Sequence, residues 1–404
     1  MLTVNEARER ILSQFTASTT ERIPLIDAAS RVLAVDISAN DDYPPFDNSA
    51  VDGFALRTED TSASSSTLNV VADIPAGSAP TVTLRAGQAA RIMTGAQIPQ
   101  GADCVIPVED TNFKNRSAGT VPPSMITFSQ QMQAGKNIRT RGMDIRAGEI
   151  VIKQGRILKP QDLGLLATLG YTDVSVYKKA RVALLSSGDE LLELGAPLEP
   201  GKIRDSNSYA LAAAILSADA EVIRLGVAKD TRASVTDLLD KAAQEHADLI
   251  LSSAGVSVGA FDFIKEVIEA NGSMDFWKVN MRPGKPLAFG SYRGIPFIGL
   301  PGNPVSAFVG FEVFVRPTLE RLSGKLDGGR QTVRVRCVEE ITSDGRESYL
   351  RATLHTQEGI RLATLTGHQG SGNLLSLVQA DALLIIPAGV KCVPAGSEVD
   401  AILL

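Results

Sequence analysis

The sequence predicts a multidomain α/β protein, and three observations lead to this fold class. The chain has 404 residues, which is too long for one ordinary hydrophobic core. From Ala180 onward, strand-like and helix-like segments alternate with short connections, as in a parallel sheet covered on both faces. Between residues 42 and 145, short strand-like runs are separated by turn residues. We therefore expect an α/β domain at residues 180–324 and an inserted β-rich domain at residues 42–145.

Two amphipathic helices flank the β-rich domain. The first is expected over residues 4–15, where a capping box begins at Thr3, and the second over residues 159–170. Each has one apolar face that needs a partner, so we expect the two helices to pack together. Residues 1–41 and 146–179 would then form a discontinuous helical domain.

The β-rich domain carries two polar loops that could bind a ligand. Thr94 directly follows a strand-like run, and Arg139 and Asp144 lie in an arginine-rich segment. Alternating arginines on a strand are equally compatible with a solvated face.

In the α/β domain, strands are expected at residues 181–185, 221–227, 248–251 and 295–298, and helices at residues 206–216 and 231–244. The third strand runs into a glycine- and serine-rich loop that contains Ser253, Gly255 and Ser257. Backbone N–H groups of such a loop, at the carboxyl edge of a sheet, can bind an anion. Asp262 then begins a helix, where its carboxylate can cap the helix or hold a metal ion.

Four carboxylates are expected to converge at this sheet edge: Asp189, Glu190, Asp230 and Asp262. One like-charge pair at ~4 Å costs about 4 kcal/mol at an effective dielectric constant near 20. A divalent cation, a shared proton or nearby cations must offset this repulsion. Helix capping and solvent exposure remain the alternative for any single carboxylate, and Asp205 or Ser206 is a candidate helix cap.

Cations follow in the sequence. Lys278, Arg282 and Lys285 surround a Pro-Gly turn, and Pro301 and Asn303 precede a helix whose N-terminus suits a phosphate or another oxyanion. No dinucleotide-binding or P-loop fingerprint is present.

Composition excludes several classes of protein. The net charge of −6 argues against nucleic-acid binding through a general basic surface. The most apolar stretch is interrupted by polar residues and prolines, so we expect no membrane span and a cytoplasmic protein. The three cysteines have no metal or redox spacing and are expected to be buried thiols.

The sequence resembles the molybdopterin molybdenumtransferase family, which includes MoeA and the gephyrin E domain. The resemblance covers nearly the whole chain and rests on the ordered motifs PPFDNSAVDG, IMTGAQIPQGAD, NIRTRGMDI, SSGDEL, IRDSN, SAGVSVGAFD, RPGKP and LPGNPVSA. It implies a homodimer of four-domain subunits. Residues 180–324 would form a domain like those of the adenylyltransferases MoaB and MogA, and residues 325–404 a C-terminal β domain with a hairpin turn at Glu358-Gly359.

The resemblance also implies the chemistry. The substrates would be adenylylated molybdopterin and molybdate, with Mg²⁺ assisting hydrolysis of the pyrophosphate link to AMP. Contact with the molybdopterin adenylyltransferase is expected as well. The family's functional residues correspond here to Asp52, Thr94, Arg139, Asp144, Glu190, Asp230, Asp262, Lys278, Arg282 and Ser371.

Two other classes of function share these features. A MoaB-like or MogA-like adenylyltransferase would use the same α/β domain but should not need the first 180 residues or the C-terminal domain. A non-catalytic scaffold like gephyrin should show an additional fused domain or a long linker, and neither is visible in this sequence.

Overall fold

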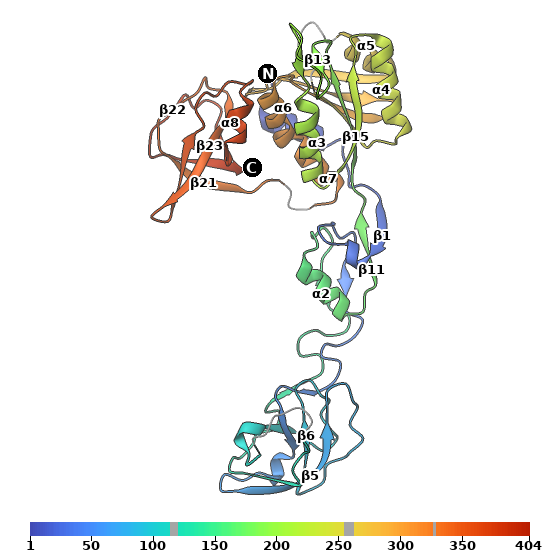
Figure 1. The fold of residues 1–404 in the computed structure, drawn as a ribbon, viewed down its shortest axis with the longest axis vertical. Helices are drawn as coiled ribbons and strands as arrows, with labels where there is room; N and C mark the ends of the chain where they lie inside the picture. Colours follow the sequence, from blue (N-terminus) through green and yellow to red (C-terminus); the bar gives the residue numbers. More distant parts are fainter. Residues whose placement is uncertain (114–119, 254–261, 326–328) are drawn as a thin grey trace. The chain divides into compact units, whose positions relative to one another are not determined.

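The computed structural model describes residues 1–113, 120–253, 262–325 and 329–404, except for the side chains of Asp262 and Phe276. The chain divides into two compact units (Figure 1). The first unit comprises Met1–Val35, Gly155–Leu163 and Thr172–Leu404, and the second comprises Asp36–Gln154 and Gly164–Tyr171. Both chain ends therefore belong to the first unit.

A six-stranded sheet lies at the centre of the first unit. Its strands follow the order β15 (Glu221–Ala228), β12 (Arg181–Ser187), β16 (Leu249–Ser253), β20 (Ile295–Leu300), β19 (Pro286–Tyr292) and β17 (Gly272–Lys278). Alternate residues of β12 enter different hydrophobic clusters, since Val182 and Leu184 lie in one, and Ala183 and Leu185 in the other. Burial on both faces explains the apolar runs of the inner strands, residues 182–185 in β12 and residues 249–251 in β16.

Helices cover both faces of this sheet: α3 (Asn207–Ser217), α4 (Arg232–Gln244), α5 (Asp262–Asn271), α6 (Pro304–Gly310) and α7 (Arg316–Leu322), with a π-helical turn at Phe311–Val315 between the last two. Residues of α3, α6 and α7 belong to one of the two hydrophobic clusters, and residues of α4 and α5 to the other. The predicted α/β fold class is confirmed, and each predicted strand and helix of this region is present with ends shifted by at most three residues.

Two strands of this sheet were not predicted from the sequence. The strands β15, β12, β16 and β20 are parallel, whereas β19 and β17 continue the sheet in antiparallel fashion. The Pro-Gly turn between Lys278 and Pro286 favours a loop. The strand signals beside it are weak, because the alternation in β17 is short and β19 contains a proline and a glycine.

The first helix, α1 (Val4–Leu12), has the predicted capping box, in which Glu6 N donates to Thr3 Oγ1 at 3.2 Å and Thr3 N donates to Glu6 Oε2 at 2.8 Å. The predicted packing of this helix against the second one is wrong. Its buried side chains join the cluster that contains α7 residues Leu319 and Leu322. Amphipathic periodicity defines an apolar face but not the surface that covers it.

The segments on either side of the β-rich region run side by side. β1 (Thr20–Pro24) pairs in antiparallel fashion with β11 (Asp173–Tyr177), and β2 (Ile37–Ser38) pairs in the same way with β10 (Ile150–Ile152). The second predicted helix is present as α2 (Pro160–Thr168). A 3₁₀ turn, Leu25–Asp27, follows β1.

A five-stranded sheet forms the core of the second unit. Its order is β7 (Cys104–Pro107), β4 (Gly53–Leu56), β6 (Gln88–Ile92), β5 (Ser66–Ile74) and β8 (Met125–Phe128). A separate two-stranded sheet pairs β3 (Asn48–Ser49), which precedes these strands in the chain, with β9 (Ile138–Arg139), which follows them. Two 3₁₀ turns are present at Thr58–Asp60 and Val108–Asp110. Gly53 is required in β4, because a Cβ there would overlap the carbonyl oxygen of Ile106 on β7.

The C-terminal part of the first unit is a closed β structure. β23 (Glu347–Gln357), β24 (Ile360–Leu365), β21 (Thr332–Cys337), β27 (Glu398–Leu403) and β25 (Ala382–Ile386) pair in this order, and β25 returns to pair with β23. The predicted hairpin turn lies between β23 and β24, where Glu358 and Gly359 both have positive φ. The remaining short elements are β13 (Leu191–Leu192), β14 (Ile203–Arg204), β18 (Met281–Arg282), β22 (Ile341–Thr342), β26 (Cys392–Val393) and α8 (Leu374–Val378).

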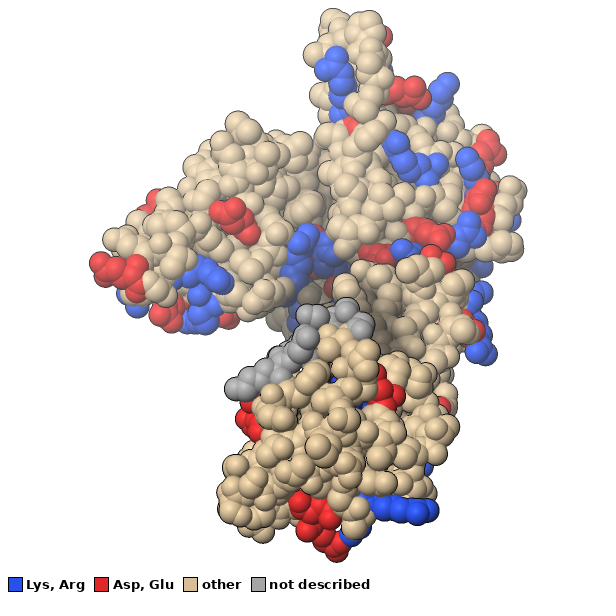
Figure 2. All heavy atoms as spheres, turned by 60° about the horizontal axis from the view of Figure 1, so that its bottom comes forward, with Lys and Arg blue, Asp and Glu red and all other residues tan. Residues whose placement is uncertain are grey.

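Surface charge is mixed. On the face shown in Figure 2, Lys and Arg side chains are interspersed with Asp and Glu. Cys104 and Cys337 are buried as predicted, but the prediction is wrong for Cys392, which is exposed. Burial raises the pKa of the Cys104 thiol to about 12. No helix among the described residues has the length and apolar character that crossing a membrane requires.

Candidate active site

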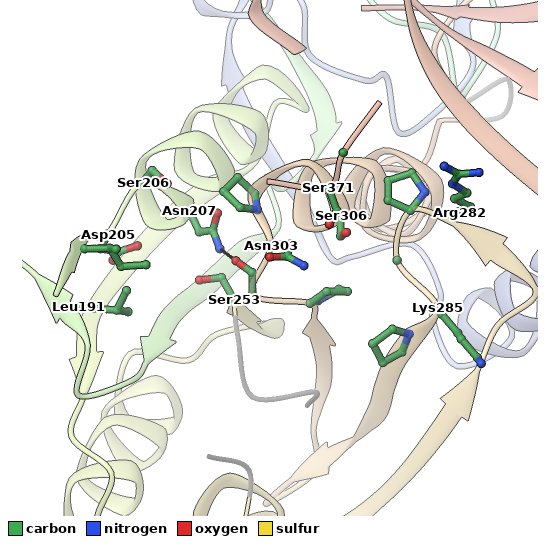
Figure 3. Close-up of a pocket in the computed structure, with 18 of the residues that line it drawn as sticks. Leu191, Asp205, Ser206, Asn207, Ser253, Arg282, Lys285, Asn303, Ser306 and Ser371 are labelled. Carbon is green, nitrogen blue, oxygen red and sulfur yellow. Dashed lines mark hydrogen bonds between the residues drawn. The ribbon is translucent and has the colours of Figure 1, made fainter. Parts of the chain in front are cut away.

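A pocket of about 720 Å³ lies at the carboxyl edge of the six-stranded sheet, within the first unit (Figure 3). Its walls come from the end of β16, the start of α3, the turn before β19, the loop between β20 and α6, and the C-terminal β structure. The first turn of α6 and the C-terminal structure are joined by a hydrogen bond from Val305 N to Ser371 O at 3.1 Å. The pocket therefore occupies the position at which open α/β sheets generally bind ligands.

One side of the pocket carries positive charge. Arg282 and Lys285 lie together at this side (Figure 3), and among the described residues neither side chain forms an ion pair. The neighbouring Arg346 is paired with Asp344 at 2.5 Å and also donates to Met281 O at 3.1 Å. Hydrogen bonds from Arg346 lower the pKa of Asp344, and the charge of Arg282 lowers it further. Arg204 also lines the pocket, where it donates to Ala196 O at 3.2 Å. On the side shown at Arg282 and Lys285, these two described side chains are the cations that remain for an anionic ligand.

A buried arginine supports the adjacent loop. Arg351 is fully buried, and its guanidinium donates to the carbonyl oxygens of His368, Gln369 and Gly370 at 3.0–3.3 Å. Its Nε donates to Ser376 Oγ at 3.1 Å. Burial lowers the pKa of Arg351, and the positive charge of Arg282 contributes to the same shift. Arg351 thus fixes the backbone that presents Ser371 to the pocket and adds positive charge behind it.

The carboxylates lie on another side. Glu190 lines the pocket, and Asp230 N donates to Asp189 Oδ1 at 3.3 Å. Partial burial raises the pKa of Asp230, and the negative charges of Asp189 and Glu190 raise it further. Asp230 therefore lies close enough to Asp189 and Glu190 for their charges to act on it. The fourth carboxylate of the prediction, that of Asp262, lies outside the described residues. Among the described side chains, however, no three His, Cys, Asp or Glu residues are placed to hold a metal ion.

Two polar pairs occur in the second unit. Thr94 donates to Asp52 Oδ1 through its backbone N at 2.7 Å and through its Oγ1 at 2.6 Å. Arg139 forms an ion pair with Asp144. The segments that bear them are linked, because Asn48 pairs with Arg139 and Gly95 N donates to Ser49 O at 2.8 Å.

The predicted site residues thus fall into several groups. Those that line the pocket are Glu190, Ser253, Arg282, Lys285, Pro301, Asn303 and Ser371. Asp189 and Asp230 lie beside Glu190, and Lys278 ends β17, where its carbonyl accepts from Leu2 N at 3.0 Å. Asp52, Thr94, Arg139 and Asp144 belong to the second unit. Gly255, Ser257 and the side chain of Asp262 lie outside the described residues.

Several residues that line the pocket were not predicted as site residues from the sequence. Arg346 and Gln369 line the pocket from the C-terminal structure, and Asp205 lines it from the start of α3. Asp205 is the helix cap that the sequence allowed, since its Oδ1 accepts from Ser208 N at 3.0 Å. The IRDSN motif could have indicated Asp205, whereas nothing in the sequence around Arg346 distinguishes it from an ordinary turn residue.

Comparison with known proteins identifies the class of protein that this fold and pocket define. Three family models match the chain in order: the MoeA N-terminal region (domain I and II) at residues 2–170, a "Probable molybdopterin binding domain" at residues 183–321, and the MoeA C-terminal region (domain IV) at residues 334–404.

Curated relatives and solved structures agree with these matches. Molybdopterin molybdenumtransferase 2 of Mycobacterium tuberculosis is 39% identical over 99% of both chains. Molybdopterin molybdenumtransferase of Haemophilus influenzae is 38% identical over 99% of this chain and 98% of its own. The crystal structure of the MoeA protein from Pyrococcus horikoshii aligns with a TM-score of 0.83 at 31% identity, over all of both chains.

The chain belongs to the MoeA family of molybdopterin molybdenumtransferases. It is accordingly a transferase of molybdenum cofactor biosynthesis.

Proposed function

We propose that this enzyme inserts molybdate into the dithiolene of adenylylated molybdopterin, with hydrolysis of the adenylyl pyrophosphate bond and release of AMP. The observation that carries the proposal is the pocket at the carboxyl edge of the sheet. It is lined by Arg282 and Lys285, which form no ion pair with any described residue, and a group of carboxylates lines it or lies near it. The substrates need both, because molybdate and phosphate are anions and phosphoryl transfer requires compensation of negative charge.

On the cationic side, Arg282 and Lys285 would hold molybdate or a phosphate oxygen. A hydrogen bond to a charged group contributes about 1.5–3 kcal/mol. Arg282 offers a planar fork of donors, whereas Lys285 offers a compact charge that can follow the anion. Ser371, presented by the loop that Arg351 fixes, adds a neutral donor to the same region.

Mg²⁺ is proposed as the cofactor on the carboxylate side, with Asp189, Glu190, Asp230 and Asp262 as its ligands. The type of donor suits this ion, since Mg²⁺ prefers oxygen ligands and usually keeps several waters. The described carboxylates are not by themselves placed to hold a metal ion, so the proposal requires Asp262 or water to complete the ligand set. The raised pKa of Asp230, caused by burial and then by Asp189 and Glu190, also fits a group of carboxylates that a cation would stabilise. When bound, the ion would supply polarisation of the phosphoryl oxygens.

Removal of the metal separates these roles. In excess chelator we expect turnover to fall much more than binding of adenylylated molybdopterin, because the cationic side of the pocket is untouched. Turnover that continues unchanged in chelator would contradict the metal proposal.

We further propose that the protein is a homodimer in which Asp52, Thr94, Arg139 and Asp144 of one protomer complete the pocket of the other. The paired arrangement of these four side chains supports a preorganised polar surface. A mixture of Asp52→Ala and Glu190→Ala proteins should regain activity through mixed dimers that contain one intact site. A fully active monomer in sedimentation would contradict this proposal.

A cytoplasmic location and a contact with the molybdopterin adenylyltransferase complete the proposal. Direct transfer would protect the pyrophosphate-linked intermediate from water between the two steps.

The reaction itself gives the decisive test. Purified protein, Mg²⁺ and adenylylated molybdopterin should release AMP only when molybdate is added, as measured by chromatography of the nucleotide. Consumption of ATP with molybdopterin, without a molybdate requirement, would instead indicate an adenylyltransferase.

A further inference from the structure

Four buried polar residues form a chain that ends at the wall of the pocket opposite Arg282 and Lys285 (Figure 3). Asp205 precedes α3, Ser208 lies in α3, Ser186 lies in β12 and Ser253 ends β16. Their exposed fractions are between 0% and 7%. Bulk water therefore does not supply their hydrogen bonds, and the partners of each hydroxyl can be counted.

The contacts run in sequence from the carboxylate to the pocket. Ser208 donates to Asp205 twice, through its backbone N to Oδ1 at 3.0 Å and through its Oγ to Oδ2. Ser186 Oγ lies 2.8 Å from Ser208 Oγ, 3.4 Å from Asp205 Oδ1 and 2.7 Å from Ser253 Oγ. Ser253 lines the pocket, as does Asp205.

The number of protons fixes the direction of these hydrogen bonds. A hydroxyl group has one proton to donate, and an ionised carboxylate only accepts. The Ser208 hydroxyl proton goes to Asp205, so the short contact between Ser186 and Ser208 requires Ser186 to be the donor. Even if Ser186 donated to Asp205 instead, its only proton would still point toward the carboxylate. Ser253 must therefore donate to Ser186, and its hydroxyl has only lone pairs left for the pocket.

We propose that Ser253 is a hydrogen-bond acceptor subsite for an N–H or O–H group of the substrate, and that Asp205 is the positioning residue that sets this polarity through Ser208 and Ser186. This inference rests on the proposed function, and it assigns Ser253 to the pterin nucleotide. Pterin rings carry amino and ring N–H donors, whereas molybdate and ionised phosphate offer acceptors alone. Ser253 therefore contributes nothing attractive to an oxyanion, which is held by Arg282 and Lys285.

The first test uses Ser253→Ala. Loss of one neutral hydrogen bond should weaken equilibrium binding of adenylylated molybdopterin by about threefold to tenfold. Molybdate binding, measured by titration calorimetry, should be unchanged. A variant that instead loses molybdate affinity and keeps nucleotide affinity would overturn the inference.

The second test reverses the chain with Asp205→Asn, which has nearly the same shape. The amide oxygen stays on Ser208 N, so the amide nitrogen faces Ser208 Oγ and donates to it. If the other hydroxyls kept their direction, the buried Ser208 proton would have no acceptor in the chain, so Ser208 donates to Ser186 and Ser186 donates to Ser253. Ser253 then becomes a donor that opposes the N–H group of the ligand. Asp205→Asn should weaken nucleotide binding by at least the same factor as Ser253→Ala.

The double variant distinguishes polarity from loss of structure. In the Asp205→Asn protein, the further change Ser253→Ala should cause no additional loss and should restore part of the nucleotide affinity, because it removes the opposing donor. Thermal unfolding checks that each variant is folded. Independent, additive losses in the double variant, or parallel losses for nucleotide and molybdate, would show a merely structural role and overturn the inference.

The wild-type protein separates this inference from the proposed function. If it binds neither adenylylated molybdopterin nor molybdate, the proposed function and this inference both fail. If it binds both but the variants do not show the expected pattern, only the inference fails.

Discussion

Two buried arginines of the first unit are held in opposite ways. Arg316 in α7 is clamped by the Glu312 carboxylate, with Nε to Oε2 at 2.6 Å and Nη2 to Oε1 at 3.0 Å, and Arg330 makes a second paired contact with the same carboxylate. Arg351 has no carboxylate partner among the described residues: its side chain donates to backbone carbonyls and to Ser376. One arginine is neutralised in the core, and the other keeps its charge behind the pocket.

The difference separates structural cations from those that act on a ligand. A buried charge without a counter-ion is costly, so it persists where the site uses it or where many donors and acceptors hold it. Arg351, Arg282 and Lys285 together give the pocket a positive side, whereas the cluster around Glu312 contributes to the stability of the fold. Substitutions in the two regions should therefore have different readouts.

The largest effect is expected for Glu312→Ala. This change leaves Arg316 buried without its counter-ion, which should lower the free energy of unfolding by about 3–5 kcal/mol. Urea unfolding measures the loss. The matched control is Asp344→Ala, which removes the partner of the more exposed Arg346 and should cost less than ~1 kcal/mol. An equal loss of unfolding free energy in the two variants would contradict the structural role assigned to the buried Glu312 cluster.

A smaller loss of stability, with a functional consequence, is expected for Arg351→Met. The change leaves the carbonyl groups of the loop without donors and should lower the free energy of unfolding by about 1–3 kcal/mol. Because the loop presents Ser371 and the charge behind the pocket is gone, molybdate binding should weaken as well. Arg351→Lys keeps the charge but loses the fork of donors, so it should recover part of the molybdate affinity. Normal molybdate binding in Arg351→Met would show that the arginine serves the fold alone.

The smallest effect is a dependence of stability on pH. Burial alone would raise the pKa of Glu312, but hydrogen bonds from Arg316 and Arg330 outweigh it and lower the pKa below its ordinary value of 4.5. The unfolded chain therefore takes up this proton first as the pH falls. The stabilisation from Glu312 is present above pH ~4.5 and is lost as the pH falls through the lower, folded-state pKa.

Glu320 has the opposite sign, because burial raises its pKa above 4.5. Its contribution favours the fold at low pH and is lost as the pH rises through the folded-state pKa. Unfolding measured from pH 3 to 7 in Glu320→Gln should therefore show a steeper loss on acidification than the wild-type protein. An identical or shallower profile would contradict these assignments.

Much of the fold could be predicted from the sequence, because each predicted element has a local signal. The apolar runs at β12 and β16 and the capping box at Thr3 act over a few residues. The partner of α1 and the two antiparallel strands could not be predicted in this way. They depend on which apolar surfaces meet after folding, and periodicity does not encode that choice.

The pocket also contains some residues that the sequence indicates and others that only the folded structure reveals. Arg282, Lys285, Pro301 and Asn303 lie in short motifs, so the sequence indicated them. Arg351 is separated from this region along the chain, and a single arginine in a strand is expected to be exposed to solvent. Its burial is a property of the closed β structure around it. The direction of the hydrogen bond from Ser253 likewise depends on contacts among β12, α3 and β16, which the sequence does not show.

Molybdate titration of the Arg282→Ala protein tests most directly whether the cationic side of the pocket binds the anionic substrate. The matched control is Arg334→Ala, which removes an exposed arginine that is paired with Asp400 at 3.2 Å outside the pocket. We expect Arg282→Ala to weaken molybdate binding by about tenfold to a hundredfold, equivalent to ~1.5–3 kcal/mol, and Arg334→Ala to leave it unchanged. Equal molybdate affinity in the wild-type and Arg282→Ala proteins would contradict the account.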